Sequence, residues 1–108
     1  MLTNWVKLTE LAGKSFIKGT LLKFSAKYPF ESEVVMMICQ SPDKSGLCLM
    51  TITGYKAGKN CYQKLPDSEV YEDVSAIWLT ENWHKWIYPE CNVKDVWVHR
   101  GLQVCDLI

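Results

Sequence analysis

The stretch from residue 75 to residue 98 constrains the fold most, because it contains four of the five tryptophans in the 108-residue chain. When this stretch is placed on a helix at about 100° per residue, its apolar residues gather on one side. They are Ala76, Leu79, Trp83, Trp86 and Ile87. The opposite side receives polar residues, namely Glu81, His84 and Lys85. The pattern predicts an amphipathic helix with a large apolar face.

The ends of this helix are marked by residues with known local preferences. Ser75 is a suitable N-cap, because its hydroxyl accepts a hydrogen bond from a free backbone N–H of the first turn. Pro89 disfavours helical angles at Tyr88, which sets the other end. We therefore predict a helix over residues 76–87. Its indole rings each contribute roughly 1.5–3 kcal/mol on full burial, so the helix needs a large apolar surface to pack on.

Short apolar and β-branched runs elsewhere in the chain predict a sheet that supplies this surface. Strands are expected over residues 16–24, 34–39, 47–53, 61–65 and 93–99, the first with a bend at Gly19. The run 34–39 is apolar throughout, so both of its faces should be covered and it should lie centrally in the sheet. The segment 5–11 fits either a short strand or one helical turn.

Turn residues at 41–46 and 54–58 join successive strands closely, which favours antiparallel pairing. We therefore predict an α+β fold, a mainly antiparallel β-meander sheet with one principal amphipathic helix packed on one face. The chain is long enough to bury a core, and residues 1–108 are expected to form a single domain.

The charge of the chain is zero overall but unevenly distributed. Residues 1–30 carry a net charge of +4, residues 31–64 carry +1, and residues 65–108 carry −5. A chain without net charge is not a general nucleic-acid binder by its overall field. We find no apolar run typical of a signal sequence or a membrane span, so we expect a cytoplasmic protein. Its five cysteines, an odd number without a Cys-x-x-Cys pair, are expected to be reduced.

Candidate catalytic and ligand sites are few. The two histidines stand far apart, and no cysteine pair has zinc-ligand spacing, so neither a metal nor a cofactor is expected. Cys91 has a loop-like setting that could suit a nucleophile, but no base or oxyanion donor accompanies it in the sequence. A basic and aromatic segment, Lys18, Lys23, Phe24, Lys27 and Tyr28, resembles RNA-binding surfaces in composition. It lacks arginine, and its aromatic residues are more simply assigned to the core.

The connection before the helix is the strongest candidate for a binding surface. Four carboxylates lie around Tyr71 and lead to Trp78, which falls off the centre of the apolar face; they are Asp67, Glu69, Glu72 and Asp73. Acids around aromatic anchors suit a protein that covers a basic partner, because charge steers the encounter and aromatic burial holds the complex. The alternative is a solvated loop whose charges favour the helix N-terminus. Tyr55 and Lys56, in a glycine-flanked connection, are second candidates for contact.

Several segments together resemble the immunity protein 45 family of bacterial polymorphic-toxin and contact-dependent growth inhibition systems. These segments are Trp78-Leu79, Asn82-Trp83, Lys85 to Cys91, Asp95-Val96 and Thr53 to Gly58. The resemblance implies a small cytoplasmic protein that neutralises the C-terminal domain of a cognate toxin, often a nuclease. The family has no catalytic motif to transfer. The near-zero net charge departs from the strongly acidic immunity proteins that guard basic nucleases.

We therefore expect an inhibitor without enzymatic activity, whose partner is a toxin domain rather than a nucleic acid or a membrane. Two alternatives remain open, a small enzyme that uses Cys91 and a structural subunit of a cytoplasmic complex. The oligomeric state is also left open.

Overall fold

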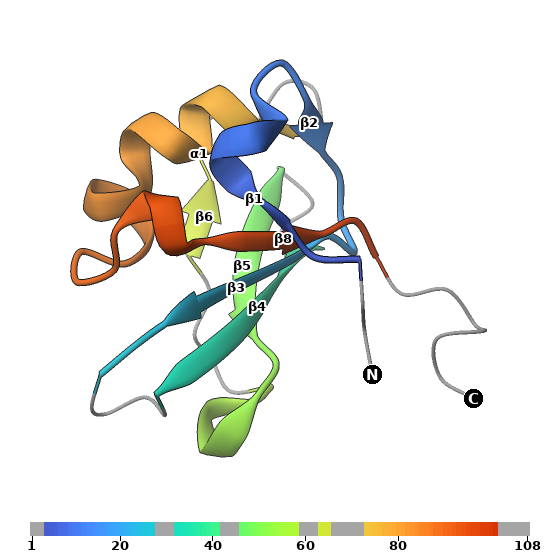
Figure 1. The fold of residues 1–108 in the computed structure, drawn as a ribbon. Coiled ribbons are helices and arrows are strands. Elements are labelled where there is room, and N and C mark those ends of the chain that lie inside the picture. Colours follow the sequence, from blue (N-terminus) through green and yellow to red (C-terminus); the bar gives the residue numbers. More distant parts are fainter. Residues whose placement is uncertain (1–3, 28–31, 42–45, 59–62, 66–72, 102–108) are drawn as a thin grey trace.

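The computed structural model describes residues 4–27, 32–41, 46–58, 63–65 and 73–101. Six strands form one sheet in the order β1-β8-β3-β4-β5-β6 (Figure 1). They are β1 (Val6–Lys7), β8 (Trp97–His99), β3 (Leu21–Ser25), β4 (Glu33–Gln40), β5 (Leu47–Thr51) and β6 (Gln63–Leu65). A second, two-stranded sheet pairs β2 (Ser15–Phe16) with β7 (Val74–Ser75). All these pairs are antiparallel.

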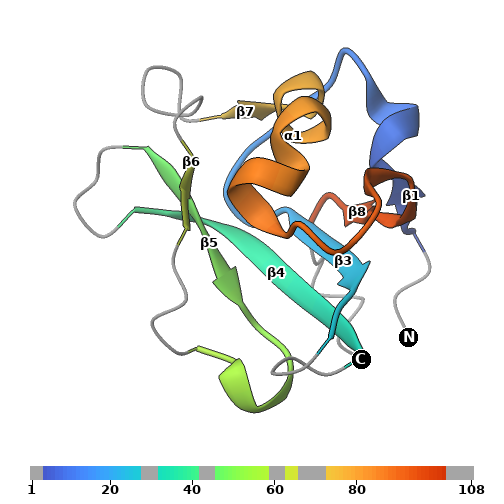
Figure 2. The ribbon, with the colours of Figure 1, turned by 90° about the vertical axis from the view of Figure 1, so that its left-hand side faces the viewer.

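The helical segments are short apart from one. The principal helix consists of α1 (Ala76–Asn82) and a π-helical continuation, η4 (Trp83–Ile87). The described residues also contain three 3-10 turns, η1 (Leu8–Leu11), η2 (Gly54–Lys56) and η5 (Val93–Asp95). The principal helix lies on one side of the sheet together with η1 and η5 (Figure 2). The predicted α+β class is confirmed. Within the described residues, no helix is long and apolar enough to cross a bilayer.

The principal helix has the predicted bounds. The Ser75 side chain accepts a hydrogen bond from the backbone N–H of Trp78 at 3.0 Å, as expected of an N-cap. The helix ends at Ile87, and Tyr88 before the proline is extended, with φ −151° and ψ 110°. The π register from Trp83 onward was not predicted. There the N–H of Tyr88 donates to the carbonyl of Trp83 at 3.0 Å, five residues back.

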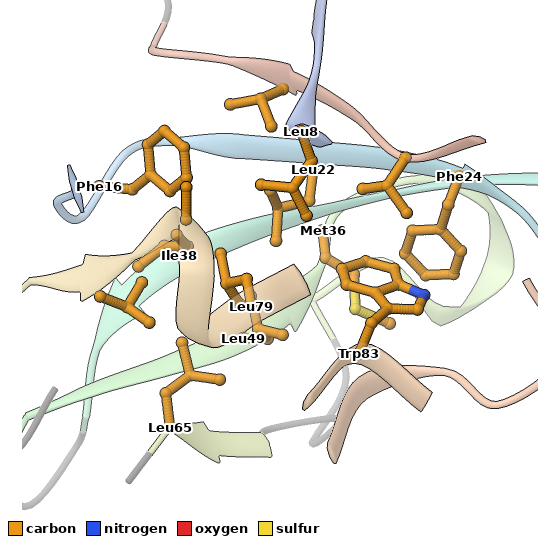
Figure 3. Close-up of a cluster of buried hydrophobic side chains, with 14 of the residues drawn as sticks. Leu8, Phe16, Leu22, Phe24, Met36, Ile38, Leu49, Leu65, Leu79 and Trp83 are labelled. Carbon is orange, nitrogen blue, oxygen red and sulfur yellow. The ribbon is translucent and has the colours of Figure 1, made fainter. Parts of the chain in front are cut away.

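The core lies between this helix and the sheet (Figure 3). Ala76, Leu79 and Trp83 are buried, and the ring of Trp83 meets that of Phe24 edge-on with centroids 5.1 Å apart. The sheet contributes the buried side chains of Leu22, Met36, Ile38 and Leu49. Trp86 and Ile87 are only half-buried. The fully buried part of the apolar face is therefore narrower than predicted. Ile87 still packs against the edge of the core, whereas Trp86 pairs with Trp78.

Three predicted strands are shorter than expected, and the simplest case is residues 47–53, where β5 ends at Thr51. Residues 16–24 do not form one bent strand, since β2 and β3 belong to different sheets and the chain turns at Gly19 with φ 96°. A positive φ is open to glycine but rare for other residues, so the strand breaks there. Residues 93–95 form the turn η5, because the Asn92 side chain accepts from the N–H of Lys94 and caps it. The segment 5–11, whose pattern fits either a short strand or one helical turn, contains both, the strand β1 and the turn η1.

Strand β4 is central, as its apolar sequence predicted. The meander β3-β4-β5-β6 is also confirmed, with Gln40 opposite Leu47 where β4 and β5 meet. The structure adds β8 and β1 beside β3, which brings the two ends of the described chain together. Side chains on the helix side of β4 are buried, whereas those on its other side are half-buried.

Candidate functional site

The outer side of the principal helix carries an aromatic pair with charged neighbours. The rings of Trp78 and Trp86 lie with centroids 6.4 Å apart and planes inclined by 41°. The Lys85 ammonium lies 6.0 Å from the centroid of Trp86. Ile77 is 51% exposed. We call this surface the helix flank, defined by Asp73, Ile77, Trp78, Glu81, Lys85 and Trp86.

Local hydrogen bonds hold the helix flank in place. The Thr80 hydroxyl donates to the carbonyl of Ala76 at 2.8 Å, and the Asn82 amide donates to that of Trp78 at 2.9 Å. The π turn that follows uses more residues per turn than an α-helix. This brings Trp86 more nearly above Trp78, so the π turn favours the aromatic pair.

The predicted contact residues are only partly described. Trp78 is half-buried and packs against the edge of the core, which confirms its predicted partial exposure. Asp73 is half-buried and immediately precedes β7, so it and Trp78 lie on either side of the Ser75 cap. The other members of the acidic connection lie outside the described residues, namely Asp67, Glu69, Tyr71 and Glu72.

The second candidates lie elsewhere in the molecule. Tyr55 and Lys56 belong to η2, which follows β5 at the end of the sheet opposite α1 (Figure 1). Lys56 is half-buried, and the side chain of Tyr55 lies outside the described part of the structure. The fold therefore does not bring η2 and the helix flank onto one continuous surface.

The thiol chemistry opposes the alternative of a Cys91 nucleophile. Cys91 is 4% exposed, and burial raises its pKa above the ordinary value of 9.0. A backbone hydrogen bond at Ser25 lowers the pKa, while the charge of Asp95 raises it further. A nucleophilic cysteine needs the reverse, an exposed thiol with a lowered pKa. Among the described residues, no group of three His, Cys, Asp or Glu side chains is placed to hold a metal ion.

Sequence reasoning missed a second cluster, on the side of the sheet away from the helix. The rings of Trp5 and His99 meet edge-on with centroids 5.4 Å apart. The Lys23 ammonium lies 4.4 Å from the centroid of Trp5, and that of Lys7 lies 5.3 Å from the centroid of Trp97. No local pattern signals these contacts, because they depend on the pairing of β1 with β8. Phe24, considered above with Lys23 as an RNA contact, is 1% exposed in the core.

Comparison with known protein families matches residues 8–98 to the family described as immunity protein 45. This range contains the whole principal helix and all strands except β1 and the last residue of β8. Searches among curated proteins and among solved structures return no significant match.

Proposed function

Because the chain belongs to the immunity protein 45 family, we propose that it binds and neutralises the C-terminal domain of a cognate polymorphic or contact-dependent inhibition toxin. The single observation that carries this proposal is the family match over residues 8–98. The proposed mode is stoichiometric binding in the cytoplasm, either over the active site of the toxin or over another surface that the toxin needs. A nuclease is the proposed class of toxin.

The chemistry of the helix flank supports a docking role. Trp78 and Trp86 are amphipathic rings held by the helix backbone, so little conformational entropy is lost when a partner covers them. Ile77 adds exposed apolar area, and Glu81 adds a negative charge. Aromatic anchors with a charged rim are the usual composition of a binding hot spot.

We propose that the toxin contacts the helix flank and the connection before it. The proposed contacts are Asp67, Glu69, Tyr71, Glu72, Asp73 and Trp78, with Tyr55 and Lys56 as a second, separate point of contact. The carboxylates would steer a basic toxin surface towards the aromatic residues, an effect that acts mainly on the association rate and weakens with salt.

The proposed function is tested by co-expression with the last domain of the long secreted protein encoded directly upstream. We expect the chain to restore growth and to form an equimolar complex with that domain. Titration of purified toxin should reach full inhibition at one equivalent of the chain. Full inhibition by a small fraction of an equivalent would instead indicate an enzyme, and absence of binding would refute the proposal.

The contact surface is tested by reversing two carboxylates, Glu72→Lys and Asp73→Lys. Association with the toxin domain should slow about tenfold at low salt, because long-range steering is lost. The matched control is Glu10→Lys with Glu90→Lys, which changes the net charge equally at two exposed positions outside the acidic connection in the sequence. Equal association rates for the two double variants would exclude the acidic connection as the steering surface.

A further inference from the structure

Strand β4 is apolar on both sides, but the described elements cover only one of them. Val34, Met36 and Ile38 face the helix and are buried. Val35 and Met37 point the other way and are half-buried. An antiparallel sheet with one solvated face normally carries polar residues on that face. An apolar stripe in this position indicates a surface that a partner covers.

Basic side chains lie beside this stripe, on the same face of the sheet. The strand register places Lys7 and Lys23 on either side of Trp97, and Val35 next to Lys23. The adjacent row contains His99, Leu21, Met37 and Met50. Leu21 and His99 are 3% and 5% exposed, so the two methionines are the half-buried members of this row. We call this surface the open sheet face, defined by Lys7, Lys23, Val35, Met37, Met50 and Trp97.

The two lysines are held close to the surface by aromatic rings. Lys7 lies over Trp97 at 5.3 Å, and Lys23 lies over Trp5 at 4.4 Å. Such contacts fix the position of an ammonium without neutralising its charge. Among the strand residues that the structure describes, the register places one carboxylate on this face, that of Glu33, in the row next to Lys23 and Val35. The face is therefore apolar and net positive.

We propose that the open sheet face docks an acidic, partly apolar segment of the toxin domain, and this inference rests on the proposed function. The stripe of Val35, Met37 and Met50 buries apolar side chains of that segment. Lys7 and Lys23 pair with its carboxylates, so charge selects the partner and apolar burial holds it. The toxin then carries an acidic element for this face in addition to any basic surface that meets the helix flank.

Two other occupants fit the face less well. A second copy of the chain would add two more lysines to the same interface, where the described strand residues of each copy offer one carboxylate, that of Glu33, to pair with them. Single-stranded nucleic acid is held by stacking on a row of aromatic rings. Here the centre of the face consists of valine and methionine side chains, and the aromatic rings of Trp97 and Trp5 lie at one side.

The test reverses both lysines, Lys7→Glu with Lys23→Glu, in the full chain. The matched control is Lys14→Glu with Lys94→Glu, at two exposed positions off this face. Each pair changes the formal net charge from 0 to −4. The Kd for the toxin domain encoded upstream should rise at least about tenfold for the first pair, and by less than about twofold for the control.

A charge-preserving pair, Lys7→Arg with Lys23→Arg, separates binding from folding. It should bind within about twofold of the wild type, and thermal unfolding should show that all three variants are folded. If the wild type binds and the reversed pair binds equally well, this inference fails and the proposed function stands. If the wild type does not bind the toxin domain, the proposed function itself fails.

Two further measurements on the wild type would overturn the inference. One is light scattering: a dimer of the wild type that becomes a monomer in the Lys7→Glu, Lys23→Glu variant would assign the face to a second copy of the chain. The other is binding of oligouridylate: binding by the wild type that the same double variant has lost would assign the face to nucleic acid. We expect a monomer and no oligouridylate binding.

Discussion

The two faces of the six-stranded sheet are built from the same strands but differ in what covers them. On the helix side, Leu22, Met36 and Leu49 are at most 7% exposed beneath Leu79 and Trp83. On the other side, Leu21, Cys48 and His99 are also buried, but the stripe of Val35, Met37 and Met50 is half-buried. Lysines lie over tryptophan rings at the rim of this side. Within the described residues, the helical elements of the core pack on the first face (Figure 2).

The difference separates stability from binding. A fully buried apolar side chain contributes to the free energy of folding, and its loss leaves a cavity. A half-buried side chain on an open face contributes less to folding and remains available to a partner. Neighbouring residues of β4 fall into opposite classes because side chains alternate along a strand. We therefore expect substitutions of sheet residues that face the helix to lower stability, and substitutions of half-buried sheet residues on the open side to lower affinity.

The largest expected effect is that of Trp83→Ala. Trp83 is fully buried against Phe24, so its truncation should lower the free energy of unfolding by about 3–5 kcal/mol. Its buried indole N–H has no hydrogen-bond partner among the described residues. Trp83→Phe removes that unpaired donor and keeps an aromatic ring, so it should cost clearly less. Urea unfolding of both variants measures the difference, and equal losses would contradict this account.

The adjacent methionines of β4 test the two faces directly. Met36 is 7% exposed on the helix side, so Met36→Ala should lower stability by about 2–5 kcal/mol. Met37→Ala, on the open side, should cost less than about 1 kcal/mol and should instead weaken toxin binding. Urea unfolding and calorimetric titration provide both quantities. A Met37 variant as unstable as the Met36 variant would show that the open face is part of the core.

The smallest expected effect concerns the thiols. Burial raises the pKa of Cys39 and Cys91, so the folded state holds these protons more tightly than the unfolded state. The resulting stability is fully present below the unfolded pKa and is lost as the pH rises through the folded value, that is, above about pH 9. Cys91→Ala should therefore lose less stability than the wild type between about pH 8 and pH 10. Equal losses in urea unfolding would exclude Cys91 as a source of this dependence.

Local signals made the principal helix predictable. Ser75 caps its start, Pro89 fixes its end, and the spacing of Leu79 and Trp83 marks the buried side. The π turn was missed because the spacing of apolar residues over 83–87 does not distinguish a π turn from a continued α-helix. Gly19 was noted as a bend, but its positive φ separates two sheets, which only the tertiary fold determines.

The two binding surfaces differ in how far the sequence could predict them. Trp78 lies off the apolar centre of the helix, so its partial exposure follows from helical geometry. The apolar run of β4 correctly predicted a central strand. It also predicted that both faces of β4 would be covered, but the described elements bury only the side chains that face the helix. The contacts of Lys7 with Trp97 depend on pairing between the two ends of the described chain, which no local pattern reports.

Methyl NMR of the methionines, with the toxin domain added stepwise, tests most directly the claim that one sheet face folds the protein and the other docks the partner. Met36 and Met37 are neighbours in the chain but lie on opposite faces, so each serves as the control for the other. We expect the methyl signals of Met37 and Met50 to shift on binding while that of Met36 stays in place. A shift of Met36 alone, or toxin binding without any change at Met37 and Met50, would contradict this account.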